Sequence, residues 1–322
     1  MTDWASWKKT VDYVVATQGR WYGIGNGDGV PLFTLPSPVS SDTPEQWMES
    51  PDLEITFPAL TPEGSPNRLA ETFILDALDE FDPSGQLPVA PGEYMLLVAF
   101  PGKDGQVERR GGAITHADAD DPENDGLPNT ITVHALNAMD VWNTIPAVSW
   151  PAAWWAATPY ERTTDESQIQ YSRPHHMARV ELATRTTFTW KHGQAGFVIR
   201  RLAQESLDAA MMTQSDPDGT RWVDDPYHVV EVPERDSTPE ISLEARDGFL
   251  WETVLAQAKN AGVILGAYIW WPGDAPVRCW SQARSTMEPA EVDISPSKGE
   301  SHRALGERVF PHAMIVLTVK EV

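Results

Sequence analysis

The densest group of possible metal ligands in the chain lies in the acidic segment 118–126, whose sequence is DADDPENDG. Carboxylate oxygens are the ligands that Ca²⁺ prefers. An EF-hand loop that begins at Asp121 fails, because Thr132 stands where the bidentate glutamate belongs and Pro122 interrupts the alternation of ligands. We interpret the segment as a solvated loop between two strands, with ion binding as the alternative. Its acidic residues are Asp118, Asp120, Asp121, Glu123 and Asp125.

Histidines and the one cysteine form the next group of possible ligands. His175 and His176 are adjacent, so their side chains cannot easily face one metal ion, and we expect them in a loop. His116 and His134 fall in two segments that we expect to be paired strands, where they can be cross-strand neighbours that pack or hydrogen-bond. Cys279 is alone, which excludes an intrachain disulfide, and we expect a buried, inert thiol. The sequence therefore predicts no metal site and no cofactor.

Motifs for nucleotide binding or catalysis are weak. The glycine-rich segment 25–29, GNGDG, has neither a buried strand before it nor a helix after it, so a dinucleotide loop is disfavoured. The chain has no G-x-S-x-G elbow and no H-E-x-x-H helix. Sequence spacing singles out no catalytic pair among the 47 acidic residues. We therefore predict no catalytic residue and no enzyme, with a cell-wall hydrolase as an alternative.

Tryptophan is unusually frequent, with 14 residues. Clustered tryptophans can line a sugar-binding face, or they can pack a core or a permanent subunit interface. We expect packing, and binding of a receptor or a cell-wall glycan is the alternative. The candidates for structural or interface roles are Trp4, Trp7, Trp154, Trp155, Trp251, Trp270 and Trp271.

The net charge of −23 limits the partners of the chain. An acidic surface disfavours stable binding to bare nucleic acid and to anionic membranes, because both need Lys and Arg. The N-terminal sequence lacks the pattern of a signal peptide, and no window is apolar enough to span a membrane. We therefore expect synthesis in the cytoplasm.

The first half of the chain alternates short strands with turns. We expect an N-terminal helix capped by Thr2 or Asp3 and ended by Gly19, which docks on its own core or on a neighbouring subunit. Segments 94–100 and 106–110 form a predicted hairpin. The helix is apolar on one face, through Trp4, Trp7, Val11, Val14 and Val15. Further predicted strands cover 53–57, 113–117 and 130–135, a short helix covers 137–144, and 67–80 stays open between helix and strand.

The second half centres on a strand–helix–strand segment at 243–274. Asp247 is the expected N-cap of its helix, Trp251 the expected inward anchor, and Gly262 the expected end. A strand at 263–271 then leads to a turn at 272–274. Before it we expect a tryptophan-rich boundary at 146–159, a strand at 182–190, a helix at 195–212, and strands at 227–232 and 240–245. After it we expect strands at 277–280, 292–294 and 313–319.

This pattern predicts an α+β class that is mostly β, in which several short strands build small barrels or sandwiches with attached short helices. We divide the chain into four segments: an amphipathic helix at 1–19, a β-barrel-like domain at 20–150, a connecting α/β domain at 151–239, and a strand–helix–strand segment at 240–322.

Two stretches resemble a known family. Residues 111–116, the acidic loop and residues 129–139 look like the first barrel of tail hub proteins of long-tailed bacteriophages. Residues 247–255 and 270–274 are similar to hub-type minor tail proteins of phages of actinobacteria. The resemblance implies a Tal-type baseplate hub, a homotrimer whose two barrel-like domains per subunit make a pseudo-sixfold ring at the distal end of the virion tail.

The resemblance also implies partners. Such a ring continues the tail tube below the distal tail protein, contacts the tape measure protein and other tail-tip or fibre proteins, and lets genomic DNA pass in transit. Many relatives carry a C-terminal hydrolase or fibre, whereas this sequence ends soon after the strand at 313–319, which puts a lytic role in doubt.

Overall fold

The computed structural model describes residues 2–43, 49–50, 52–75, 93–102, 105–121, 128–147, 160–165, 167–177, 190–211, 226–245, 248–280 and 305–321. It is mostly β, with 44% strand and 26% helix, which confirms the broad α+β class. Its strands form several sheets, and none of them closes into a barrel within the described residues. The barrels expected from the sequence therefore stay a prediction.

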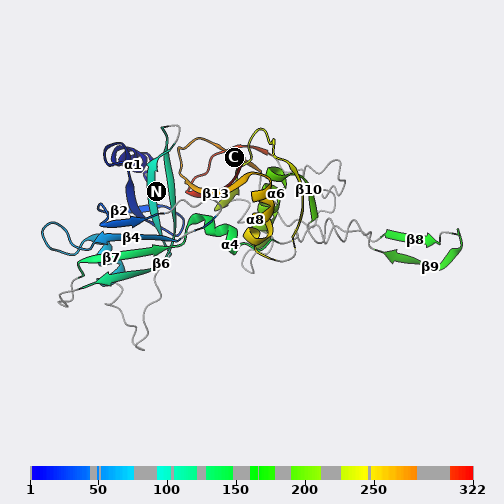
Figure 1. Cartoon of the computed structure of the whole chain (residues 1–322), viewed down its shortest axis with the longest axis horizontal. Coiled ribbons are helices and arrows are strands. Elements are labelled where there is room, and N and C mark those ends of the chain that lie inside the picture. Colours follow the sequence, from blue (N-terminus) through cyan, green and yellow to red (C-terminus); the bar gives the residue numbers. More distant parts are fainter. Residues whose placement is uncertain are drawn as a thin grey trace, which may run out of the picture. The chain divides into compact units, whose positions relative to one another are not determined.

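The chain divides into two compact units (Figure 1). Unit 1 comprises Met1–Asp140, Ala267–Ala275 and Val309–Val316. Unit 2 comprises Val141–Gly266, Pro276–Arg308 and Leu317–Val322. The four segments expected from the sequence stay a prediction.

The N-terminal helix α1 spans Trp4–Gln18, as the apolar spacing predicts. The Asp3 side chain accepts a hydrogen bond from the Ser6 N–H, and Gly19 ends the helix with a φ of 83°. Val11 and Val15 are buried in a hydrophobic core of unit 1. The helix therefore docks on the core of its own chain, which was one of the two surfaces expected for it.

Unit 1 is built on a seven-stranded sheet with the order β2-β1-β5-β6-β7-β4-β3. Neighbouring strands in this order are antiparallel throughout. The strands are β1 Trp21–Asn26, β2 Pro31–Thr34, β3 Ser40–Asp42, β4 Leu53–Pro58, β5 Tyr94–Pro101, β6 Val107–Asp120 and β7 Thr130–Ala135. The predicted strands at 53–57, 94–100 and 130–135 are confirmed, and so is the β5–β6 hairpin.

Strand β5 is apolar along its whole length because both of its faces are covered. Leu96 and Val98 pack into a core with β1, β4 and β7. Met95, Leu97 and Ala99 face the opposite way, into the core that holds α1. A one-residue change of register would exchange these two faces, so the sequence of β5 specifies its pairing strongly.

Strand β6 corrects the predicted separate strand at 113–117, because it runs unbroken from Val107 to Asp120. Its first half pairs with β5, and after a bulge at Ile114/His116 its second half pairs with β7. A bulged strand that changes partners is how a sheet turns a corner. Gly111 and Gly112 lie at this point, and a Cβ on Gly112 would lie 1.3 Å from the Leu136 carbonyl oxygen.

We expect Gly112→Ala to lower the free energy of unfolding by about 2–3 kcal/mol, because the new methyl group can be relieved only by moving backbone. Urea denaturation followed by far-UV circular dichroism measures the change. Gly306→Ala is the matched control, since Gly306 is also in a strand but has open space where its Cβ would lie. Equal stability of the two variants would contradict the close approach at Gly112.

The helical segments of the first half follow the sequence closely. Segment 67–80, left open between helix and strand, is helical where it is described: α2 covers Arg68–Ala70 and η1 covers Glu71–Leu75. Asn67 caps α2 by accepting hydrogen bonds from the Leu69 and Ala70 N–H groups. The short helix expected at 137–144 forms as η2 Ala138–Asp140 and α4 Val141–Thr144.

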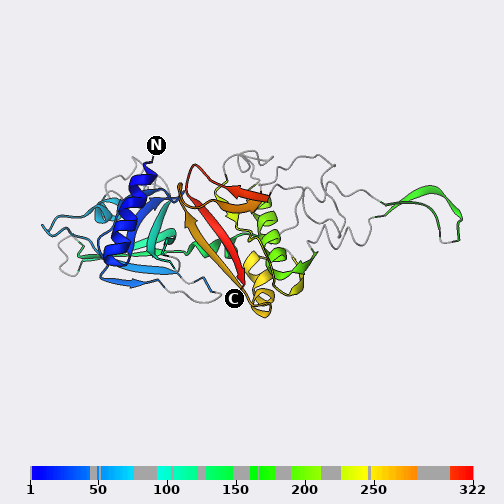
Figure 2. The ribbon, with the colours of Figure 1, turned by 90° about the horizontal axis from the view of Figure 1, so that it is seen from above.

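Unit 2 contains two longer helices that pack on each other and on short sheets. Helix α6 covers Ala195–Ala210 and helix α8 covers Leu250–Asn260, close to their predicted bounds (Figures 1 and 2). Ile199 and Leu202 of α6 are buried. The small sheets pair β10 with β12, β14 with β15, β8 with β9, and β11 and β13 with the central β16.

The strands of the second half are β8 Tyr160–Thr164, β9 Gln170–Met177, β10 Trp190–Gln194, β11 His228–Val230, β12 Glu240–Glu244, β13 Val263–Trp270, β14 Val277–Trp280, β15 Leu305–Arg308 and β16 Met314–Glu321. The chain passes between the two units within β13 and β16. The loop expected at His175 and His176 is wrong, because both residues lie in β9 and pair with β8. The strands predicted at 182–189 and 292–294, and most of the boundary at 146–159, lie outside the described residues.

The N-cap and the buried face of helix α8 both differ from the prediction. Its N-cap is Phe249, which makes no side-chain capping bond, and the expected cap Asp247 lies outside the described residues. Leu250, Val254 and Ala258 are the buried positions, whereas Trp251 is only half-buried. Helix α8 packs on α6, α4 and β12, and the row of apolar residues that is buried there excludes Trp251. The expected end is confirmed, since Gly262 has a φ of 67°.

Candidate functional site

The tryptophans of unit 1 form a cluster around Trp271, which has no exposed surface. Its ring lies 5.8 Å from that of Trp4 and meets that of Trp21 edge-on at 6.1 Å, between ring centroids. Trp7 packs edge-on against Trp21 at 6.3 Å. These are favourable aromatic geometries, and they join α1 to β1 and to the turn after β13. Trp4, Trp7 and Trp271 therefore act in the core of their own unit.

The other tryptophans that were candidates for an interface differ in burial. Trp270 is buried, donates its indole N–H to the Ala275 carbonyl at 2.8 Å and packs edge-on against Phe310. Trp251 is half-buried on α8, and its interface role stays a prediction. Trp154 and Trp155 lie outside the described residues. Core packing is thus what the structure gives Trp4, Trp7, Trp270 and Trp271, rather than an open sugar-binding face.

A charged anchor adjoins the tryptophan cluster. Asp274 accepts hydrogen bonds from Arg109, from Lys8 at 2.6 Å and from the Trp271 N–H at 2.8 Å. The Arg109 guanidinium also lies 4.5 Å from the Trp271 ring, in a cation–π arrangement. Lys8 additionally donates to the Gly273 carbonyl at 2.6 Å, which fixes α1 to the predicted turn at 272–274. Sequence reasoning missed this anchor, because its members are up to 266 positions apart.

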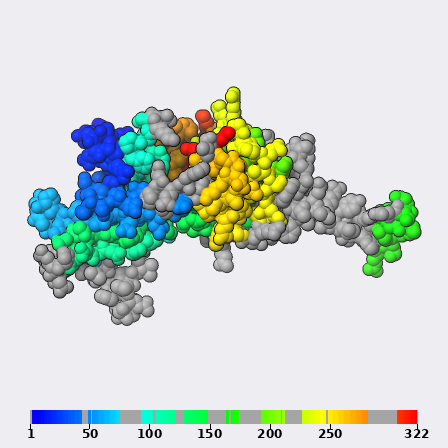
Figure 3. Space-filling view, in the orientation of Figure 1, coloured from blue at the N-terminus to red at the C-terminus, as the bar shows by residue number. Residues whose placement is uncertain are grey.

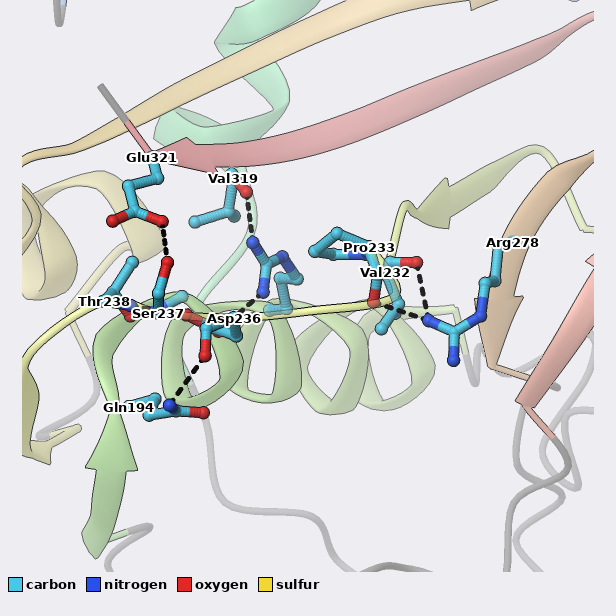
Figure 4. A network of polar contacts seen from close by, with 11 residues as sticks. Gln194, Val232, Pro233, Asp236, Ser237, Thr238, Arg278, Val319 and Glu321 are labelled. Carbon is cyan, nitrogen blue, oxygen red and sulfur yellow. Dashed lines mark hydrogen bonds and ion pairs between the residues drawn. The ribbon is translucent and has the colours of Figure 1, made fainter.

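Unit 2 contains a buried ion pair, part of the polar network in Figure 4. Arg200 on α6 donates to Asp236 at 2.9 Å and to the Val319 carbonyl of β16. Asp236 also accepts from the Thr238 N–H and hydroxyl, at 3.1 and 2.6 Å. Gly196 leaves room for the pair, since a Cβ there would lie 2.6 Å from the Asp236 carboxylate. The network ties the loop between β11 and β12 to helix α6 and to the last strand.

The electrostatics of this pair follow from burial and from its hydrogen bonds. Burial lowers the pKa of Arg200 from its ordinary value, although Asp236 opposes the effect. Burial by itself raises the pKa of Asp236, but the hydrogen bonds from Thr238 and the charge of Arg200 outweigh it, so this pKa falls. Both side chains therefore stay charged at neutral pH, and the pair acts as a structural tie.

Two further groups in unit 2 have pKa values shifted by burial. The expected burial of Cys279 is confirmed, and burial raises the pKa of its thiol to about 11. Burial lowers the pKa of His228 from 6.5 to about 4. The residue as a whole is half-buried, but its Nδ1 atom is buried without a hydrogen-bond partner among the described residues. His228 therefore folds as the neutral imidazole.

We expect His228 to make folding sensitive to acid. A base with a folded pKa of about 4 and an unfolded value of 6.5 gives full stability above pH 6.5, which is lost as the pH falls toward 4. At about pH 5 the loss amounts to roughly 2 kcal/mol. Urea denaturation across this pH range, compared between wild type and His228→Gln, measures it. Parallel pH profiles of the two proteins would contradict the assignment.

An exposed cluster on strands β6 and β7 brings together His116, Asp118 and His134, whose possible metal-ligand atoms lie within 4.8 Å of one another. The predicted cross-strand pairing of the histidines is confirmed, and their rings stack 4.2 Å apart at 6°. Asp118 Oδ2 lies 3.1 Å from His134 Nε2 and 3.9 Å from His116 Nε2. Figure 3 shows β4 (blue) beside β6 and β7 (cyan to green) on the surface of unit 1.

The spacing of His116 and Asp118 in the sequence already indicates part of this cluster. His116 and Asp118 are two positions apart on one strand, so their side chains share a face, and the pairing of the two histidines adds the third ligand. Glu54 on β4 lies opposite His134 in the register, with its Oε2 atom 3.8 Å from His134 Nδ1. Of the acidic segment, Asp118, Asp120 and Asp121 are described, whereas Glu123 and Asp125 are not.

The glycine-rich segment 25–29 is a hairpin turn between β1 and β2. The Asn26 side chain accepts from the Val30 N–H at 2.9 Å, and Gly29 has a φ of 74°. A buried strand does precede this segment, contrary to the sequence analysis, but a strand follows it instead of a helix. The element that would hold a pyrophosphate is therefore not there.

Comparisons with known protein families and with curated proteins found no match for this chain. Among the described helices, none has the length and apolar character needed to cross a lipid bilayer.

Proposed function

We propose that this chain is a structural protein of a bacteriophage virion, the hub of a tail tip or baseplate, which assembles with copies of itself around a channel. In this proposal it continues the tail tube below the distal tail protein, and tape measure and DNA pass through it during infection. It has no catalytic role.

The observation that carries the proposal is the local structure of the segment that resembles hub proteins. Residues 129–139 contain strand β7 and, two residues after it, the short helix η2. Gly111 and Gly112, in the other part of that segment, lie where β6 changes partners and closes a corner of the sheet. A corner of this kind is what a barrel-like hub domain needs.

The edges of the sheet give the proposal a physical route to assembly. Strands β2 and β3 end the seven-stranded order, so each leaves backbone groups without a strand partner among the described residues. Such edges pair readily with another chain. Pairing edges between copies would close the open sheets into the pseudo-sixfold ring of a homotrimer with two barrel-like domains per subunit. Closed cyclic symmetry protects those edges from further growth.

The charge of the chain suits a conduit. Formal charge is −23, and DNA passing through an acidic channel finds no cations to hold its phosphates. We therefore expect the lumen of the assembled ring to be lined by more Asp and Glu than Lys and Arg. An electron-microscopy map of the assembly that shows a mainly basic lining would contradict this part of the proposal.

The decisive test uses purified particles of the phage that encodes the chain. Mass spectrometry is expected to find this protein among the virion proteins, and cryo-electron microscopy is expected to place its folded units around the axis at the tail tip. Absence from purified virions would overturn the proposal. So would a lone, off-axis position on the particle.

The alternative functions have less support from the geometry. A glycan-binding face would need open aromatic rings, but no tryptophan whose side chain the structure describes is more than half-exposed. A hydrolase would need a cleft that holds paired acids, and of two open hollows on the described surface one is lined by a single acid, Asp12, and the other by none.

A further inference from the structure

We propose that His116, Asp118 and His134 bind one divalent transition-metal ion, with Zn²⁺ as the expected ligand and Co²⁺, Ni²⁺ and Cu²⁺ as substitutes. The proposal rests on the geometry of the β6–β7 pair and does not depend on the hub function.

The three side chains share the outward face of two paired strands. His116 and His134 are directly opposite in the register, and Asp118 is opposite Thr132, one step along the same face. Around the cluster the inward positions are apolar, including Val133 and Ile131, which are fully buried. The rigid sheet therefore holds all three ligands on one side, so binding requires only rotation of side chains.

One histidine is already in the form that binds metal. The Thr115 hydroxyl donates its single hydrogen to the His134 carbonyl at 3.2 Å. With its hydrogen on that carbonyl, the hydroxyl accepts from the His116 ring at Nδ1, 3.0 Å away, an arrangement that favours the tautomer with the proton on Nδ1. His116 Nε2 is left with its lone pair, on the side where Asp118 lies. An oriented imidazole of this kind is typical of metal ligands.

The second histidine has a carboxylate on each side. His134 Nε2 donates to Asp118 at 3.1 Å, and Nδ1 faces Glu54 at 3.8 Å. When a metal ion takes the place of this hydrogen bond at Nε2, the neutral imidazole carries its single proton on Nδ1, toward Glu54.

The ligand types select the metal. Two imidazoles and one carboxylate suit Zn²⁺ and its neighbours in the transition series, whereas Ca²⁺ and Mg²⁺ prefer oxygen ligands. Tetrahedral zinc with bonds of about 2.0–2.1 Å places its ligands roughly 3.3 Å apart, close to the separations of Asp118 from the two rings. Asp118 and His116 are exposed, so water can occupy the fourth position. The acidic chain also concentrates cations near its surface.

Calorimetric titration of Zn²⁺ and the absorption spectrum of added Co²⁺ test the site on the purified full-length chain. Wild type is expected to bind one ion per chain, and Co²⁺ is expected to give the visible bands of a tetrahedral complex. His134→Gln and Asp118→Asn should each weaken binding by at least about 10-fold, and Glu54→Gln by roughly 10-fold through the orientation of His134.

His192→Gln is the matched control, because His192 is an exposed strand histidine beside a carboxylate, Glu240, but belongs to no cluster of three ligands among the described residues. It should leave the affinity unchanged. Circular dichroism checks that each variant is folded, which is expected since the replaced side chains point away from the core. No stoichiometric binding to wild type would overturn the proposal. So would binding that the His116→Gln, His134→Gln double variant retains, or equal affinity for Ca²⁺ and Zn²⁺.

Discussion

Replacing Trp271 with alanine is expected to lower the free energy of unfolding by about 3–5 kcal/mol. The ring is fully buried, and it contacts Trp4, Trp21 and the Arg109 guanidinium. Its removal leaves a large cavity under α1 and takes away one of the two groups that hold the buried Arg109 charge. Urea denaturation followed by far-UV circular dichroism measures the loss.

Trp251→Ala is the matched control for this prediction. Trp251 is half-buried on α8, whereas Leu250, Val254 and Ala258 form the buried face. Truncating it should therefore cost roughly 1–2 kcal/mol, because less surface is exposed and little cavity is left. If Trp251→Ala cost as much as Trp271→Ala, the orientation of α8 described above would be wrong.

Asp236→Ala is expected to cost about 3–5 kcal/mol, because it leaves Arg200 as a buried charge without its partner. The Arg200 side chain is only 4% exposed, so water cannot replace the carboxylate. Thr238 also loses two hydrogen bonds to the Asp236 side chain. Urea denaturation at neutral pH measures the effect.

The double variant Arg200→Met, Asp236→Ala removes both charges. It therefore separates the cost of losing the ion pair from the cost of leaving Arg200 charged and buried without Asp236. It should be more stable than Asp236→Ala alone, because burying an apolar side chain costs much less free energy than burying a guanidinium without its partner. A double variant less stable than the single one would show that the pair contributes net stability beyond charge balance.

The pH dependence of the same pair has a definite sign. The pKa of Asp236 is lowered in the folded protein, so its contribution is complete above the ordinary carboxyl value of 3.8 and is lost as the pH falls through the lower folded value. The stability difference between wild type and Asp236→Asn should therefore persist at about pH 5 and shrink only in stronger acid. A difference that disappears already near neutrality would contradict the lowered pKa.

Much of the local structure could be predicted because short-range periodicity reports which face of an element is buried. Helix α1, the β5–β6 hairpin and helix α6 form at nearly their predicted bounds. The stop signals Gly19 and Gly262 were also predictable, since each adopts the positive φ that only glycine takes without cost.

The predictions from sequence are wrong where the local pattern fits two arrangements about equally well. At those places, contacts with elements distant in the sequence decide which arrangement forms. Helix α8 packs on α6, α4 and β12, and the apolar row that it buries there excludes Trp251. Strand β6 was predicted as two segments, 106–110 and 113–117, but pairing with β5 and then with β7 keeps it continuous.

The sequence by itself determined the mostly β class, the bounds of the main helices and strands, and the buried cysteine, because each depends on residues a few positions apart. Only the tertiary structure decided which side chains meet. Arg109 and Asp274 are 165 positions apart, and Arg200 and Val319 are 119 apart. His116 and His134 become a possible metal site only through the register of two strands. Contacts of this kind depend on how elements pack, which no local pattern encodes.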